Sequence, residues 1–422
     1  MKKVILQIVF LFFGITIFVP MYAQNIVTLN QCYEKARANY PLIKQQNLLD
    51  ISAEYTLDNI SKGYLPQISV NGQYTTQSDV TSIPLKIPGV SIPSLSTEQY
   101  KAYVEIQQGI TGNYVVAKQK GVAQANAEIE KQKLEVELYK LHERIQDLYF
   151  GILLVNSQLD LIALSKKDIQ TGIEKVNAAV ANGIAFKSSA DILQAELISI
   201  EQRETELHYK KYGLILMLQS FTKIEFTDAS IFQIPSNPEF KMKITRPEMS
   251  VFDKQMQMFD AQSKVITSQN IPKLGLFFQT GYGNPALNMF SNSLDYYYIG
   301  GVRFTWNLGG LYTYSKDQDL LKIQKDMVGV QKDVFVFNTT LAATQKNADV
   351  QMFEKFIDSD NEIIALRVKV VENAKAQLEN GAITTNDYIN YVNARDKAAQ
   401  NLAIHKIQYL QEMYKLSNYM GE

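Results

Sequence analysis

Two proline-free spans of equal length constrain this chain more than any other feature. Gly112 and Gly183 are 71 residues apart, and so are Gly310 and Gly381. Neither interval contains a proline, the residue that most strongly disrupts a helix interior. A single helix of that length would measure roughly 105 Å at about 1.5 Å per residue. Two such rods are too long for one compact domain, so they need another explanation.

The spacing of apolar residues indicates that these rods are coiled coils. From Leu134 to Ile162 the apolar positions alternate at intervals of four and three, and the series resumes at Ile169. A period of 3.5 residues keeps one apolar seam facing a partner helix along its whole length. After Gly183 the same spacing returns between Leu193 and Leu218, which predicts an antiparallel return helix.

Other stretches have the two-residue period of β-strands. Residues 67–75 alternate apolar or small side chains with polar ones, and the pattern reappears around Val104. A second pair follows at Leu274–Tyr282 and Tyr296–Leu308, with one apolar, aromatic face and one polar face that carries Arg303. The chain therefore has four expected strands of about ten residues, arranged as two hairpins with long loops.

The landmarks repeat, which indicates an internal duplication. Pro41 and Pro66 are 25 residues apart, as are Pro247 and Pro272. The predicted first repeat covers 24–222, with a hairpin at about 64–111, a long helix at about 113–182 and a return helix at about 190–220. The predicted connector covers 223–246. The predicted second repeat covers 247–422, with a hairpin at about 273–309, a long helix at about 311–380 and a return helix at about 386–420.

Residues 1–23 have the pattern of a secretory signal peptide: Lys2 and Lys3, an apolar core, and a region ending at Ala23 that suits cleavage. A membrane anchor is the alternative, although the apolar run is short for a full span. The single cysteine, Cys32, excludes an internal disulfide framework.

The sequence offers no chemistry typical of an enzyme. The three histidines are far apart, and none has a metal-spaced partner. We find no phosphate-binding glycine loop with lysine. The formal charge of −1 gives no basic signature of nucleic-acid binding. We therefore predict a protein that is not an enzyme and uses no cofactor and no metal.

The strands have the length of tilted membrane strands, and strands in lipid must close into a barrel. The smallest such barrels have about eight strands, so a chain with four must either associate with copies of itself or form a soluble sheet. Aromatic residues near the strands favour a membrane, because barrels carry aromatic girdles at both interfaces. The predicted aromatic belt consists of Tyr74, Tyr282, Tyr296, Tyr298 and Trp306.

The ordered set of elements resembles the TolC family of outer-membrane efflux proteins over essentially the whole mature chain. Leu29–Ala36 followed by Asn39–Ile43 is similar to that family's first helix. Phe304–Gly310 resembles its last strand and exit turn, and Gly381–Asp387 resembles its second hairpin tip.

This resemblance implies a mixed α and β fold and a homotrimeric channel-tunnel. Three chains would supply a twelve-stranded barrel in outer-membrane lipid and a periplasmic α-barrel of coiled-coil helices. The implied function is that of a passive outer-membrane conduit in a tripartite efflux system, exporting drugs, metals or other toxic compounds. The implied partners are a periplasmic adaptor protein and an inner-membrane pump of RND or ABC type.

The resemblance also assigns roles to particular residues. The adaptor-docking tips and closed entrance would be Gly183, Ile184 and Ala185, together with Gly381, Ala382 and Ile383. Asp387 maps onto the first of two aspartate rings that narrow the entrance in better-known members, whereas Asn390 stands at the second. The alternative role for Asp387 is that of a helix N-cap.

Three other functions remain open from the sequence. A type I protein secretion channel would share every element. A soluble periplasmic coiled-coil adaptor would share the long helices but would not need two hairpins with bilayer-length aromatic faces. A structural coiled-coil protein of the cell envelope is the third.

Overall fold

The computed structural model describes residues 26–81, 89, 94–227, 230–239, 241 and 243–421. The expected signal peptide at 1–23 lies outside these residues. The chain divides into two compact units, each assembled from three stretches. The tip unit comprises the residues up to Tyr40, Leu141–Glu239 and Asn347–Lys415, and the sheet unit comprises Pro41–Lys140, Phe240–Lys346 and the residues from Leu416. Each unit draws on both halves of the chain, so the predicted repeats do not coincide with compact units.

Long helices and short strands alternate along the chain. The helices are α2 (Leu29–Asn39), α3 (Lys44–Ser61), α4 (Gly112–Tyr139), α5 (Leu141–Ala181), α6 (Lys187–Thr222), α7 (Pro247–Gln269), α8 (Leu311–Glu379) and α9 (Thr385–Met420). The strands are β1 (Ile26–Val27), β2 (Gln67–Thr76), β3 (Glu98–Gly109), β4 (Ile231–Phe232), β5 (Lys273–Asn284) and β6 (Asp295–Thr305).

The two long spans differ from each other. α8 is continuous over 69 residues, whereas the first span is interrupted at Lys140 between α4 and α5. Lys140 keeps helical dihedral angles, and its N–H still donates to the Val136 carbonyl. The span predicted as one helix at 113–182 thus consists of α4 and α5, which meet at Lys140, and the boundary between the two units falls at the same residue.

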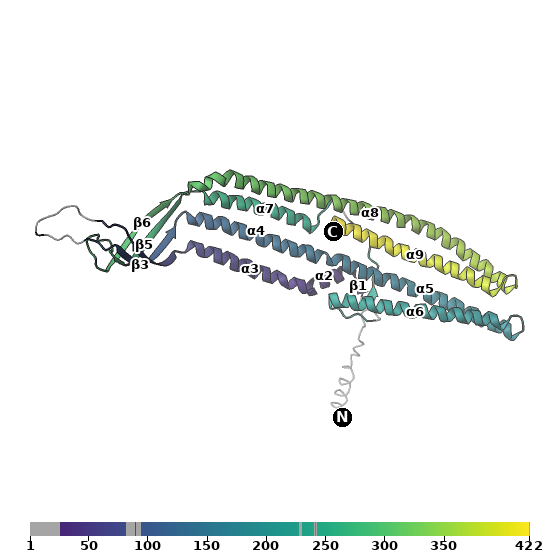
Figure 1. Cartoon of the computed structure of the whole chain (residues 1–422). Coiled ribbons are helices and arrows are strands. Elements are labelled where there is room, and N and C mark those ends of the chain that lie inside the picture. Colours follow the sequence, from purple (N-terminus) through teal and green to yellow (C-terminus); the bar gives the residue numbers. More distant parts are fainter. Residues whose placement is uncertain are drawn as a thin grey trace, which may run out of the picture. The chain divides into compact units, whose positions relative to one another are not determined.

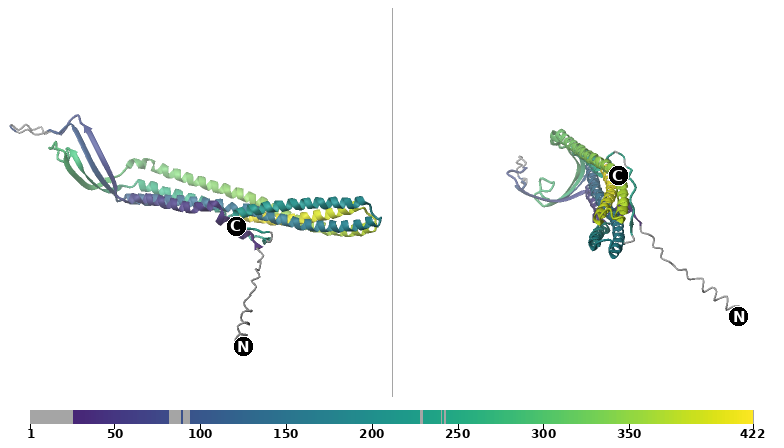
Figure 2. Two further views of the ribbon diagram at one scale, coloured as in Figure 1. Left: turned by 90° about the horizontal axis from the view of Figure 1, so that it is seen from below. Right: turned by 90° about the vertical axis from the view of Figure 1, so that its right-hand side faces the viewer.

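In the sheet unit, α4 packs between α3 and α7, and the four long strands form one antiparallel sheet in the order β2-β3-β5-β6 (Figure 1). β2 and β3 are the first hairpin, β5 and β6 are the second, and β3 pairs with β5. The strands extend past the helix ends, so none of the described helices covers either face of the sheet (Figure 2).

In the tip unit, the 3.5-residue seam of α5 packs against α6. Val155, Ile162 and Ile169 of α5 are buried with Leu193 and Ile200 of α6 in one apolar cluster. The predicted antiparallel return helix is confirmed, although it begins three residues earlier than expected, at Lys187.

A second apolar cluster of the tip unit surrounds Tyr149, whose hydroxyl oxygen lies 2.7 Å from the carbonyl oxygens of both Val27 and Gln233 and can donate its one hydrogen to either. These carbonyls belong to or flank β1 and β4, which form a parallel two-stranded ladder. The sequence did not predict this ladder, because two residues are too few to show a periodicity.

The span from Gly112 to Ala181 contains a window that is long and apolar enough for a membrane helix, with a mean hydropathy of 1.5. Several apolar residues of α5, including Ile145, Tyr149 and Ile152, are almost fully buried. A helix in a protein core has the same composition, so the window is weak evidence for a membrane span.

Candidate channel-forming surfaces

One face of the four-stranded sheet is apolar and exposed from edge to edge. The strand register places Val70, Val104, Thr280 and Tyr298 in one row across the sheet. The neighbouring rows also carry large apolar side chains, and the exposed ones on this face are Ile68, Val70, Tyr74, Tyr100, Val104, Ile106, Leu276, Phe278, Tyr282, Tyr296, Tyr298, Val302 and Phe304. A face of this size and composition is costly to leave in water.

The five residues of the predicted aromatic belt are all exposed. Tyr74, Tyr282, Tyr296 and Tyr298 lie on the apolar face and are between 55% and 64% exposed. Trp306 follows the end of β6 and is 46% exposed, and its indole N–H donates to the Asn270 carbonyl at 3.1 Å. An exposed ring with a satisfied polar tip suits the boundary between lipid and water.

The opposite face of the sheet is polar and contains an ion pair. Arg303 Nη1 lies 3.0 Å from Glu105 Oε1, and the guanidinium stacks over the Phe277 ring at 4.5 Å. Gln279 Nε2 donates to the other carboxylate oxygen of Glu105 at 3.3 Å. The charge of Arg303 is thus paired, although its side chain is 42% exposed rather than buried.

Both edges of this sheet are unpaired in the part of the chain that the structure describes. β2 pairs only with β3, and β6 pairs only with β5. An unpaired edge is a row of N–H and C=O groups that can accept another strand. Because the strands alternate in direction, β6 of one chain and β2 of another would pair antiparallel, like every other neighbour in the sheet.

The first half of α8 presents a second unpartnered surface. Its exposed apolar residues recur at intervals of three and four, and here they are called the α8 stripe: Leu320, Ile323, Met327, Val330, Val334, Phe337 and Leu341. These residues are 53% to 63% exposed, whereas Val328 on another face of the same helix is buried. The spacing is that of a coiled-coil seam without its partner helix.

The two helical hairpins end in the same backbone motif. Gly183 and Gly381 have positive φ values of 69° and 70°. The next residues, Ile184 and Ala382, donate back to the carbonyls of Ala179 and Gln377, both at 2.8 Å. These are the bonds of a Schellman motif, in which glycine takes the left-handed conformation at the helix end.

The side chains at the two tips differ. The first tip exposes Ile184 and Phe186, at 81% and 83%, and no side chain caps the α6 start. At the second tip Ala382 is exposed and Ile383 half-buried. There α9 begins with a capping box: Asp387 N–H donates to Thr384 Oγ1, and Thr384 N–H donates to Asp387 Oδ2 at 3.0 Å.

Asp387 is therefore the N3 residue of the helix, which closes the capping box with the N-cap residue Thr384. The alternative prediction that Asp387 is the N-cap itself is wrong. The Thr384 hydroxyl also donates to its carboxylate at 2.6 Å, and this bond, followed by the one from the Thr384 N–H, lowers the pKa of Asp387. Asp387 and Asn390 are both exposed. The motif Thr384-Thr-Asn-Asp387 was visible in the sequence as a capping signal.

The structure also reveals a polar cluster between α5 and α9 that sequence reasoning missed. Arg395 Nη2 donates to Asp168 Oδ2 at 2.6 Å, and Arg395 also bonds its neighbour Asp396. Ser165 donates to the other oxygen of Asp396. Residues so distant in sequence carry no local signal of their contact. In the described residues no group of three His, Cys, Asp or Glu side chains could hold a metal ion.

Comparison of this fold with solved structures identifies its class. It is the fold of the outer-membrane channels, and the expected TolC-like architecture of long helices with a small antiparallel sheet is confirmed at the level of one chain. Neither the protein-family models nor the curated proteins give a sequence match.

Three solved structures illustrate the similarity. The CmeC outer membrane channel of Campylobacter jejuni is 14% identical, with 93% of this chain and 85% of that chain covered and a TM-score of 0.64. CusC is 12% identical, with 93% and 92% covered and a TM-score of 0.68. The outer membrane protein VceC of Vibrio cholerae is 12% identical, with 93% and 96% covered and a TM-score of 0.66.

Proposed function

We propose that this chain is the outer-membrane channel of a tripartite efflux system, a passive conduit that exports small molecules. The observation that carries the proposal is the four-stranded sheet, which is mainly apolar on one face, mainly polar on the other, and unpaired at both edges within the described residues. An apolar face suits contact with lipid, and the polar face would then line water.

Four strands do not close a barrel, so the proposed channel is an assembly of several chains. Joining β6 of one copy to β2 of the next satisfies every edge hydrogen bond, as a membrane requires. Three copies of a four-stranded sheet give the twelve strands expected from the family resemblance. The α8 stripe supports the same assembly, because a neighbouring copy would cover it with a helix.

The remaining partners follow from the same proposal. The Schellman tips at Gly183 and Gly381 would meet a periplasmic adaptor, and the exposed Ile184 and Phe186 give the first tip apolar side chains for that contact. The described residues provide no metal cluster for chemistry. An inner-membrane pump, as the family resemblance implies, would supply the energy of transport.

The chain's single tryptophan offers a direct test of the membrane orientation. We expect Trp306 fluorescence in reconstituted protein to be quenched by lipids brominated near the headgroup, and less by lipids brominated at the bilayer centre. The reason is that a belt residue lies at the interface rather than in the hydrocarbon core. Steady-state emission in matched vesicles measures this.

The control is the same protein in vesicles without bromine. Emission that is equal in all three lipids, together with recovery of the protein in the soluble fraction, would rule out a membrane barrel and favour a soluble adaptor.

A further inference from the structure

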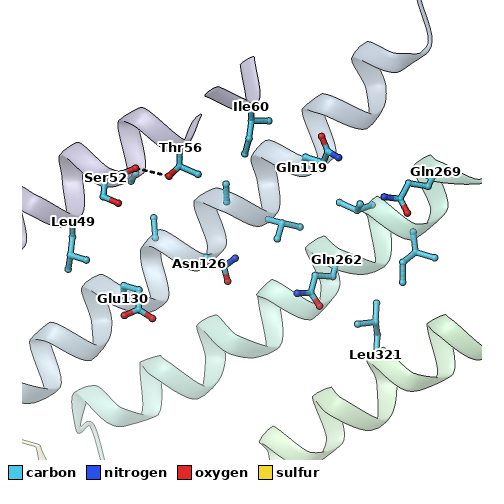
Figure 3. Close-up of a pocket in the computed structure, with 16 residues that line it drawn as sticks. Leu49, Ser52, Thr56, Ile60, Gln119, Asn126, Glu130, Gln262, Gln269 and Leu321 are labelled. Atoms are coloured by element: carbon cyan, nitrogen blue, oxygen red, sulfur yellow. Dashed lines mark hydrogen bonds between the residues drawn. The ribbon is translucent and has the colours of Figure 1, made fainter. Parts of the chain in front are cut away.

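The helices of the sheet unit line an open hollow of about 820 Å³ on one side of the unit (Figure 3). Its lining extends from Leu49 on α3, across α4 and α7, to Leu321 on α8. Because one hollow touches all four helices, the surface that they form is concave on this side. The volume is in the range of pockets that hold drug-sized ligands, about 300–1,000 Å³.

The lining of the hollow combines small apolar side chains with amides. Ala123 and Val265 are among the apolar residues, and the side-chain amides come from Gln119, Asn126, Gln262 and Gln269 (Figure 3). Within the described part of the chain none of these four amides bonds to another residue. They are therefore available both to donate and to accept hydrogen bonds from a ligand.

Charge is nearly absent from the lining. Glu130 is the one ionisable residue of the hollow, and its carboxylate already accepts a hydrogen bond from Lys133 at 2.8 Å. Among the described residues, ion pairs that cross between the helices of this unit include four whose residues do not line the hollow. These pairs are Lys131–Asp50, Lys254–Glu128, Lys325–Asp260 and Lys332–Asp253.

We propose that this hollow binds uncharged amphiphilic organic molecules of drug size. Apolar surface with a few polar groups is the usual composition of a small-molecule site. A charged ligand would find one partly neutralised carboxylate and no cation, whereas an uncharged ligand with hydrogen-bonding groups meets four available amides.

This inference rests on the proposed channel function, because it names the class of cargo. In a closed ring of copies the concave side faces inward, so the hollow would be a transient resting place on the conduit wall. The test therefore measures occupancy and conduction separately.

Occupancy is measured by protection of an introduced thiol in the full-length, reconstituted protein. Ala123→Cys places the thiol in the hollow, and Ala125→Cys is the matched control, because Ala125 is a half-buried alanine of the same helix that does not line it. The native Cys32 is fully buried, and burial raises its pKa to about 12, so it adds no background labelling.

The probe is N-phenyl-1-naphthylamine, an uncharged amphiphile, and the reagent is a water-soluble charged maleimide. We expect probe at about four times its dissociation constant to slow alkylation at position 123 about fivefold, which corresponds to an occupancy of roughly four-fifths. Alkylation at position 125 should be unchanged. Tetraphenylphosphonium, a cation of similar size, should protect position 123 less.

Equal alkylation of position 123 with and without probe, or equal protection of positions 123 and 125, overturns the inference. Stronger protection by the cation overturns the assignment to uncharged ligands. Single-channel recording of the same variants tests the function independently. If the variants conduct ions but the probe does not protect position 123, the binding site is rejected and the channel function stands. If the probe protects position 123 but the variants do not conduct, the binding site stands and the channel function is rejected.

Discussion

Asp387, which the family resemblance places at the channel entrance, also has a local structural role at the start of α9. Its carboxylate accepts both the Thr384 N–H and the Thr384 hydroxyl, which fixes the first turn of α9 directly after the glycine turn. The carboxylate remains exposed. A role at the channel entrance would therefore depend on a side chain whose orientation is set by Thr384.

We expect Thr384→Ala to loosen the start of α9. Loss of the capping hydroxyl costs about 1 kcal/mol, so amide hydrogens in the first turn should exchange roughly fivefold faster. Hydrogen–deuterium exchange with mass spectrometry would detect this. The first tip, which lacks a side-chain cap, is the internal control and should not change.

Acid should weaken the same cap, because the Thr384 bonds lower the pKa of Asp387 in the folded chain. A depressed carboxylate pKa contributes stability above the usual value of about 3.9, and that contribution is lost as the pH falls through the folded value. The Thr384→Ala variant should lose less on acidification than the native chain. Equal losses would contradict the coupling.

Gly281 occupies a position where a side chain does not fit. It lies between Tyr103 and Tyr297 in the strand register, and a Cβ atom there would approach the Ala102 carbonyl oxygen to 2.1 Å and the Tyr103 Cα atom to 2.6 Å. Backbone atoms cannot move aside as a flexible side chain could. The pairing of β3 with β5 therefore requires glycine at this residue.

We expect Gly281→Ala to destabilise the sheet by about 1–3 kcal/mol, the usual cost of overpacking. Gly72→Ala on β2 is the matched control, because nothing lies within 4 Å of its added Cβ. Thermal unfolding of the reconstituted proteins compares the two. A Gly281→Ala protein as stable as the Gly72→Ala protein would contradict the strand register.

At the scale of elements, sequence reasoning succeeded where a period repeats many times. The seam of α5 and the alternation of β5 extend over enough residues for their periods to be read without ambiguity. It failed where a feature is short or depends on distant contacts. The β1–β4 ladder has two residues per strand, and the Arg395–Asp168 bond joins residues 227 positions apart. The irregularity at Lys140 falls within a regular apolar pattern and left no trace in it.

The α8 stripe gives a prediction for one element. We expect Val334→Asp to prevent assembly, because a neighbour would have to bury an unpaired carboxylate at a cost of several kcal/mol per copy. A penalty of about 3 kcal/mol weakens association more than a hundredfold. Multi-angle light scattering in detergent reports the mass of the assembly.

Lys322→Asp is the control for the stripe. It also introduces a carboxylate on the exposed surface of α8, but Lys322 is not part of the apolar series. Assembly should survive this change. A Val334→Asp protein with the native mass would show that the stripe is not the contact between copies.

For the whole molecule, the entrance prediction concerns the assembled channel rather than one chain. Symmetry-related copies of Asp387 would form a ring of carboxylates, and such a ring controls cation passage. We expect Asp387→Ala to raise single-channel conductance and to weaken block by divalent cations. Asp191→Ala, an exposed acid on the first return helix, should leave both unchanged. Unaltered single-channel currents in the Asp387→Ala variant would contradict the hypothesis that Asp387 forms a ring at the entrance.

Each compact unit combines segments that lie far apart in the chain, and this slows the pairing of its strands during folding. Tyr100 of β3 lies opposite Asn284 of β5, 184 residues further along the chain. Strands so far apart pair slowly, since loop closure precedes any gain from their contact. Until then the hairpins expose unsatisfied edges to misfolding and aggregation. A newly made chain of this design is therefore exposed to aggregation until β3 and β5 have paired and the sheet edges have met those of neighbouring copies.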